Sequence, residues 1–137
     1  MNLGSVNWIA IVVATIASMA LGAGWYMVLA RQWMGALDKT REQIMGQSGG
    51  SVMPFVIAAL MQLIMAYSLA LFMPALMGST NVVNGLIVGF HVWLGFVVTS
   101  MIINHRYQGS KWSLTLIDGG YLLGVLLVQG VVIGLFG

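Results

Sequence analysis

The stretch SLTLIDGGYLLGVLLVQGVVIGLF, from Ser113 to Phe136, is long and apolar enough to cross a lipid bilayer. A helix rises about 1.5 Å per residue, so about 20 apolar residues cover the roughly 30 Å of hydrocarbon. Inside hydrocarbon every backbone amide needs a partner within the protein, and we therefore expect this stretch to be a helix. A single acid, Asp118, stands near its start.

Three earlier stretches have the same character, at about 7–30, 52–77 and 85–104, and with 113–136 they make four spans. The sequence predicts a single transmembrane domain over residues 1–137. Its fold class is all-α, an integral membrane four-helix bundle. The connections 31–51 and 105–112 are polar.

The first connection carries a helix signal of its own. Thr40 and Gln43 have the spacing of a capping box, which predicts a short amphipathic helix over about 41–46. This helix would lie at the membrane surface between spans one and two. A solvated loop with one helical turn is the alternative.

The composition favours lipid as the solvent of this chain. Of its 137 residues, 60% are hydrophobic and 6% are charged, whereas soluble domains carry about 25% charged residues. The lipid bilayer is thus an expected partner. Cysteine is absent, which excludes disulfides and thiolate metal sites. Five cations against three acids are too few to indicate nucleic-acid binding.

The cations indicate which way the spans point. All of them lie in the two polar connections, as Arg31, Lys39, Arg41, Arg106 and Lys111. The positive-inside rule then places both connections in the cytoplasm and both chain ends outside. The first span has no positive charge before it, so we expect it to be retained rather than cleaved as a signal peptide.

Aromatic residues agree with this orientation, because amphipathic rings prefer the membrane boundaries. Trp8 falls at the outer boundary. The inner boundary carries Trp25, Tyr26, Trp33 and Trp112.

Small residues recur at intervals of four along the spans, a pattern typical of close helix packing in lipid. They are Ala10, Ala14, Ser18 and Gly22, then Gly85 and Gly89, and finally Gly120, Gly124, Gly130 and Gly134. The two glycine pairs of the last span are staggered and point in different directions. This surplus of small faces favours a homo-oligomer or a place in a larger membrane complex.

Four polar residues lie inside the spans, and they are the candidate site: Asp118, Gln62, His91 and Gln129. We expect Asp118 to be buried against Gln62 and one cation. The candidate cations are Arg31, Arg106 and Lys111. Two interpretations remain open. Asp118 is either a hydrogen-bonded acid that fixes helix register, or a carboxylate that binds a cation or proton from a cytoplasmic cavity.

His91 and Gln129 reach similar depths on the third and fourth spans, which predicts a hydrogen bond between them. A pH-sensing histidine is the alternative. His105 falls at the opposite surface, so the two histidines cannot share a metal or haem. Because no nucleophile set, paired carboxylates or phosphate loop is found, we expect neither enzymatic activity nor a metal or cofactor.

Several short motifs resemble those of one protein family. They are Asn7-Trp8, Gly22-Ala23-Gly24-Trp25-Tyr26, Trp93-Leu94-Gly95-Phe96, Lys111-Trp112 and Leu116-Ile117-Asp118-Gly119-Gly120-Tyr121. Together they resemble the small bacterial four-span proteins known as domain of unknown function 1761, over nearly the whole chain. The resemblance implies a bacterial inner-membrane protein and brings no catalytic residues.

Two functions follow as hypotheses. The first is a small oligomeric transporter or channel-like protein with a polar site near Asp118. The second is a structural or accessory subunit of a larger membrane complex. A small multidrug exporter fits the length, but the first span has no acid and the charge bias does not fit dual topology.

Overall fold

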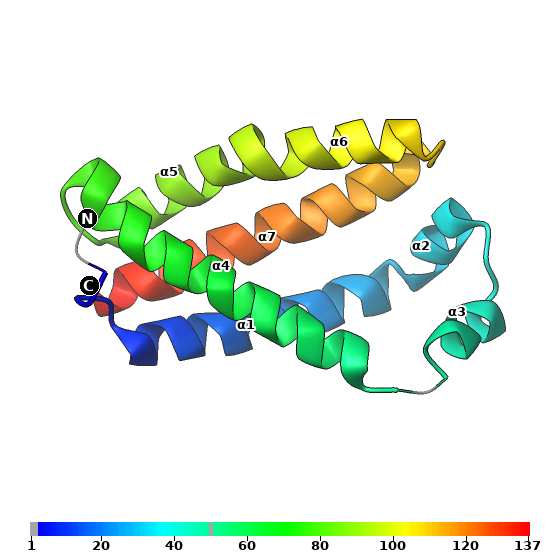
Figure 1. Cartoon of the computed structure of the whole chain (residues 1–137), viewed down its shortest axis with the longest axis horizontal. Coiled ribbons are helices and arrows are strands. Elements are labelled where there is room, and N and C mark those ends of the chain that lie inside the picture. The colour runs from blue at the N-terminus through cyan, green and yellow to red at the C-terminus, as the bar shows by residue number, and fades with distance from the viewer. Residues whose placement is uncertain (1–2, 50) are drawn as a thin grey trace.

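The computed structural model describes residues 3–49 and 51–137 as helices joined by short turns (Figure 1). The helices are α1 (Trp8–Val28), α2 (Ala30–Leu37), α3 (Arg41–Ser48), α4 (Met53–Met77), α5 (Val82–Val92), α6 (Val98–Tyr107) and α7 (Trp112–Phe136), with a π-helix η1 (Trp93–Val97) between α5 and α6. The all-α, four-helix-bundle prediction is confirmed.

In the part of the chain that the structure describes, four helices are long and apolar enough to cross a membrane: α1, α4, the continuous Val82–Tyr107 span and α7. The third is longer at both ends than the predicted 85–104. It begins early because the Asn81 side chain accepts a 2.9 Å hydrogen bond from the Asn84 amide and caps the helix.

The other three long helices are arranged around α7, which contacts α1, α4 and α5 (Figure 1). Both chain ends lie at one end of the bundle. The short helices α2 and α3 and the α6–α7 turn lie at the other. The segments that carry all five Lys and Arg residues are therefore at the end away from the termini.

The first connection is more structured than its sequence predicted. The capping box is present, because Thr40 Oγ1 accepts from the Gln43 amide and the Gln43 side chain accepts from the Thr40 amide. However, two short helices form instead of one. Asp38 ends α2 in the left-handed region (φ 56°), and its carboxylate forms a 2.7 Å salt bridge with Lys111. This bridge holds the connection to the start of α7.

Close backbone contact determines how α5 and α7 cross. A Cβ atom on Gly85 would lie 2.1 Å from the carbonyl oxygen of Gly130, and one on Gly130 would lie 2.3 Å from that of Gly85. Neither position has room for a methyl group, so glycine at both lets the two backbones touch. Such contact matters in lipid, where apolar burial gives helices little reason to associate.

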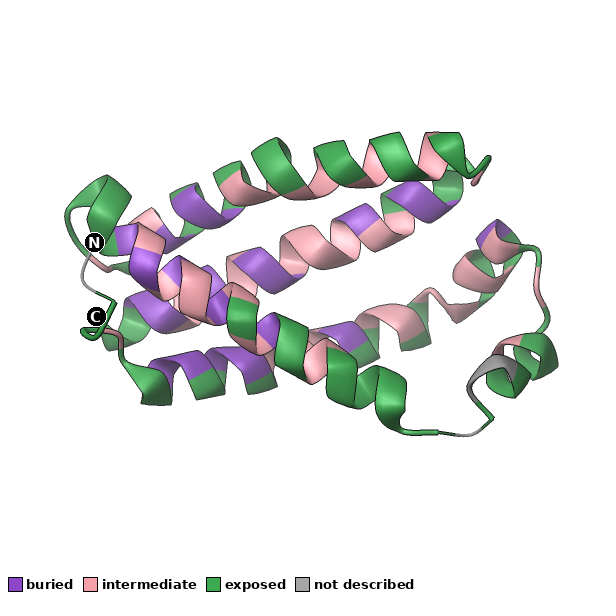
Figure 2. Ribbon diagram, viewed as in Figure 1, coloured by how far each residue is buried: buried purple, intermediate pink, exposed green. Residues whose placement is uncertain are grey.

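Burial is uneven among the spans (Figure 2). In the most apolar 18-residue stretch of α7, 39% is buried inside the bundle. The corresponding share in the third span is 11%. The third span packs mainly on α7, and its outer face carries exposed large side chains such as Phe90, Leu94 and Phe96.

Candidate functional site

A polar network occupies the centre of the bundle and joins three helices. Ser18 Oγ on α1 donates to Gln62 Oε1 on α4 at 2.6 Å. Gln62 Nε2 donates to the hydroxyl of Tyr121 on α7 at 2.5 Å. Gln129, also on α7, donates from Nε2 to Ser18 Oγ (3.1 Å) and to the backbone carbonyl of Gln62 (2.9 Å). Ser18, Gln62 and Gln129 are all buried, so the bonds among these three are shielded from competing water, whereas the bond to Tyr121 is partly buried.

Small residues make the room for this network. Gly22 lies one helical turn beyond Ser18, and a Cβ there would come within 2.8 Å of the Tyr121 ring. Every position of the first-span stripe, Ala10, Ala14, Ser18 and Gly22, is buried. One acceptor in the network remains without a partner among the described residues, the buried Oε1 of Gln129.

Asp118 lies outside this network, and the interpretation that paired it with Gln62 is wrong. Its Oδ1 instead accepts a 2.6 Å hydrogen bond from the hydroxyl of Tyr26 on α1. The Tyr26 and Tyr121 rings meet edge to face at 5.1 Å; Asp118 bonds to the hydroxyl of the first ring and Gln62 to that of the second. Gln62 is engaged by Tyr121, which follows Asp118 by three residues and lies deeper in the span.

The expected cation partner of Asp118 is also not found, because two of the candidates bond to other groups and the third faces outward. Lys111 pairs with Asp38, as described above. Arg106 donates from Nη2 to Thr115 Oγ1 at 2.9 Å, and its guanidinium lies over the Trp112 ring. Arg31 is exposed on α2. Among the residues that the structure describes, Asp118 therefore forms no salt bridge.

Two tryptophans anchor the backbone of α7 beside Asp118. Trp25 Nε1 on α1 donates to the Ile117 carbonyl at 3.0 Å, and Trp93 Nε1 on η1 donates to the Gly119 carbonyl at 2.8 Å. The Trp25 ring lies where a Cβ of Gly120 would come within 2.9 Å of it. The backbone of α7 is thus bonded to two neighbouring elements, α1 and η1.

The predicted hydrogen bond between His91 and Gln129 is wrong as well. The His91 side chain is exposed on the outer face of α5, and its Nδ1 lies 2.7 Å from the Ile87 carbonyl oxygen of the same helix. Gln129 faces inward to Ser18 and Gln62. The two residues share a depth but not a face, because α5 presents Gly85 and Gly89 to α7 rather than His91.

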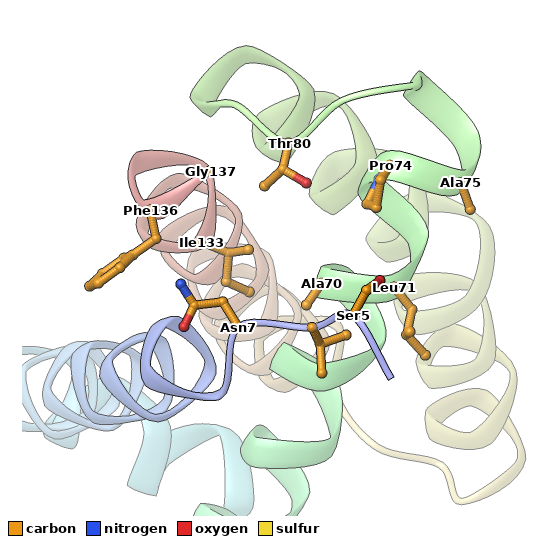
Figure 3. A pocket seen from close by; sticks show the side chains of 11 residues that line it. Ser5, Asn7, Ala70, Leu71, Pro74, Ala75, Thr80, Ile133, Phe136 and Gly137 are labelled. Carbon is orange, nitrogen blue, oxygen red and sulfur yellow. The ribbon is translucent and has the colours of Figure 1, made fainter. Parts of the chain in front are cut away.

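A pocket of about 520 Å³ opens at the end of the bundle that carries the chain ends (Figure 3). It is lined mainly by small or apolar groups of α4 and α7 with a few polar ones, including Asn7 and Thr80. A second, shallower pocket of about 450 Å³ lies beside the end of α6, lined by Ile102, Ile103, Arg106 and Tyr107. Neither pocket is lined by Asp118 or Gln62.

A family model described as a protein of unknown function, DUF1761, matches residues 9–134. The chain belongs to the DUF1761 family. No curated protein and no solved structure shows significant similarity to it.

The glycine pairs on the last span of this DUF1761 protein have partners within the chain. Gly120 and Gly124 contact Trp25 and Leu21 of α1, whereas Gly130 and Gly134 contact Gly85 and Asn81 at the start of α5. Two neighbouring helices thus explain why the pairs point in two directions. These two pairs therefore leave no free small face for a homo-oligomer or a larger complex, and the prediction of such an assembly stays a prediction.

Sequence reasoning on the DUF1761 chain missed the hydroxyl groups that complete the site. The sequence indicates Tyr26 only as a boundary aromatic, and Tyr121 only as part of a motif. Helical spacing offered a signal, because Tyr121 follows Asp118 by three residues and shares its face. Nothing in the sequence indicated that a hydroxyl of α1, rather than a cation, would meet the acid.

Proposed function

We propose that the DUF1761 protein is an accessory subunit of a larger membrane complex and that its third span binds a transmembrane helix of another polypeptide. The observation that carries the proposal is the exposed ring of His91. His91 lies about 14 Å along the span from Val82, at about 1.5 Å per residue. This distance puts the ring near the middle of a hydrocarbon layer about 30 Å thick.

The hydrogen bonding of His91 defines what the ring needs. A carbonyl oxygen can only accept, so Nδ1 carries the proton that it donates to Ile87, and Nε2 of the neutral ring is an acceptor. Among the described residues, no group donates to Nε2. An acceptor left bare in hydrocarbon costs free energy, and a donor on an adjacent helix would remove that cost.

The surface around His91 suits a close helix contact. Gly95 and Thr99 follow it at intervals of four, and both are exposed. A Cβ at Gly95 would meet no atom within 4 Å, so another backbone can approach there. The Thr99 hydroxyl already donates to the Gly95 carbonyl at 3.0 Å, which leaves His91 as the group that still needs a partner.

The partner helix should carry a hydrogen-bond donor, such as a Ser, Thr, Asn or Trp side chain. A second copy of this chain fits less well. Parallel two-fold pairing through this face would bring one His91 against another, so that two acceptors would meet. A second copy is therefore an outcome for the experiment to exclude.

The interior supports the subunit function better than transport. Gln62 uses both side-chain polar atoms and its backbone carbonyl to join α1, α4 and α7. A group engaged in this way holds helices together and is not free to bind a substrate. Because neither described pocket reaches Asp118, we also assign this acid a structural role, the first of the two interpretations above.

The test compares variants at His91 in native membranes extracted with mild detergent. We expect the wild-type chain to migrate in native electrophoresis as an assembly larger than its own 14.7 kDa would give. His91→Leu should release the free chain, whereas His91→Gln, which keeps an acceptor, should retain much of the assembly. Ile64→Ala, at an exposed position on α4, is the control and should change nothing.

One further measurement separates loss of contact from misfolding, and a second identifies the partner. The purified His91→Leu chain should melt at or above the wild-type temperature, because the change removes a polar group from an apolar face. Assembly that survives His91→Leu would contradict the proposal. So would the His91-dependent co-purification of two differently tagged copies, which would make the partner a second copy.

A further inference from the structure

We infer that the end of α6 binds an anionic phospholipid, with Arg106 contacting the phosphate and the adjacent groove receiving part of an acyl chain. This site is separate from the His91 surface and does not depend on the proposed function.

The groove combines a charge with an apolar wall. It has a volume of about 450 Å³ and is lined by Ile102, Ile103, Arg106 and Tyr107. The two isoleucines lie about one helical turn before the end of α6, on the hydrocarbon side of Arg106. Ile103 and Tyr107 are exposed, so the groove opens outward to where lipid would lie. An acyl chain along the isoleucines would bring its phosphate to the level of Arg106.

Arg106 is held in place but is not neutralised. Its Nη2 donates to Thr115 Oγ1, and its Cζ lies 3.7 Å from the centroid of the Trp112 ring. A guanidinium has five N–H donors, and the Thr115 bond uses one of them. No carboxylate lies within salt-bridge distance of Arg106 in the described part of the chain. A fixed cation of this kind attracts an anion, and phosphate accepts from a guanidinium with good geometry.

The start of α7 adds to the attraction for an anion. The cap residue of α7, Lys111, makes no side-chain capping bond, so the first amides of the helix have no side-chain acceptor. The N-terminal end of a helix carries a partial positive charge. Trp112 is the first residue of this helix and lies under the Arg106 guanidinium. The helix end therefore adds to the field at Arg106.

A membrane lipid is the occupant rather than free phosphate, because the groove has apolar walls that a free ion would not use. The site lies at the end of the bundle that carries every Lys and Arg of the chain. Basic residues at the boundary of a span attract anionic headgroups.

The experiment measures the melting temperature of the full chain in neutral detergent with one of three additives. Phosphatidylglycerol should raise the melting temperature by several degrees, because a ligand of the folded state stabilises it. Phosphatidylcholine and glycerol 3-phosphate should not, since one lacks net charge and the other lacks acyl chains. Native mass spectrometry should show phosphatidylglycerol bound to the same samples.

Three variants locate the site. Arg106→Gln should weaken phosphatidylglycerol binding about fivefold or more, as expected for the loss of one cation near lipid. Ile103→Trp fills the groove while keeping Arg106, and should weaken binding to a similar degree. This second variant decides the matter if Arg106→Gln does not fold. Arg41→Gln removes a cation at the same end of the chain and should bind as the wild type does.

Three results would overturn the inference. One is an equal shift with phosphatidylcholine. Another is an equal shift with glycerol 3-phosphate, which would indicate a free-phosphate site. The third is an equal loss in Arg41→Gln and Arg106→Gln, which would indicate diffuse attraction of charge rather than a site.

Discussion

Gln62 is the residue whose side chain links α4 to both α1 and α7. Its amide accepts from Ser18 and donates to Tyr121, and both partners belong to other helices. A carboxamide can do both because it carries an acceptor and donors on one planar group. No apolar side chain of similar size could satisfy both hydroxyl groups.

Gln62→Leu should therefore lower the free energy of unfolding by about 1–3 kcal/mol, the usual range for leaving buried polar groups without partners. The bond from Gln129 to the backbone carbonyl of residue 62 is retained, so we expect a loss of stability rather than a failure to fold. Unfolding of the purified chain in mixed micelles measures the effect.

The control is Ser68→Ala on the same helix. Among the described residues the Ser68 hydroxyl bonds only to the carbonyl of Ile64 within α4, so its removal should change stability little. Equal losses in the two variants would mean that the cross-helix bonds of Gln62 contribute nothing.

At the residue scale the sequence could identify the polar groups but not their partners. Gln62, Gln129 and Asp118 were recognisable because a polar group inside an apolar span needs a partner. Which partner depends on the rotation of each helix about its own axis. A rotation of a few tens of degrees decides whether Asp118 meets Tyr26 or Gln62, and no spacing rule fixes the rotation of one helix against another.

Among the helices, α5 and α7 make the closest contact, and Gly85 and Gly130 are where their backbones meet. Gly130→Ala places a methyl group against the Gly85 carbonyl, a backbone atom that cannot move aside unless the helices separate. We expect a loss of about 1–3 kcal/mol, as for other overpacked sites.

Gly95→Ala is the matched control, because a Cβ at Gly95 would meet no atom within 4 Å. The same methyl group should cost nothing there in the isolated chain. Thermal melting of both variants in one detergent makes the comparison. A Gly130→Ala chain as stable as Gly95→Ala would contradict the observed crossing.

Elements were the most predictable level of this structure, for a physical reason. In hydrocarbon a chain of this composition satisfies its backbone hydrogen bonds by forming helices. The length and apolarity of the segments therefore predicted all four spans. The π-helix at Trp93–Val97 was not predictable, because it has no distinct composition. Its Val98 amide bonds back to the Trp93 carbonyl, five residues earlier, and the widened turn lies where Trp93 reaches the Gly119 carbonyl of α7. Such a turn depends on a tertiary contact rather than on local sequence.

For the whole molecule, the sequence predicted which segments share an end of the bundle but not which helix lies at its centre. An even number of spans brings both chain ends together, as Figure 1 shows. The central place of α7 follows from its several small and polar faces, which pack on α1, α4 and α5. Those faces are visible in the sequence, which predicts close helix packing but does not indicate how many of the faces are used within one chain.

The orientation of the bundle in the membrane can be tested cleanly, because the chain contains no cysteine and any introduced thiol is the only one. Leu3→Cys places a thiol at the end with the termini, and Gln108→Cys places one in the α6–α7 turn with the cations. The positive-inside rule predicts that a membrane-impermeant maleimide will label Leu3→Cys on intact bacterial cells, and Gln108→Cys only after lysis. The cysteine-free parent is the control for background labelling. The reverse pattern would keep the bundle and reject the predicted orientation, whereas labelling of both thiols from outside would reject the four spans themselves.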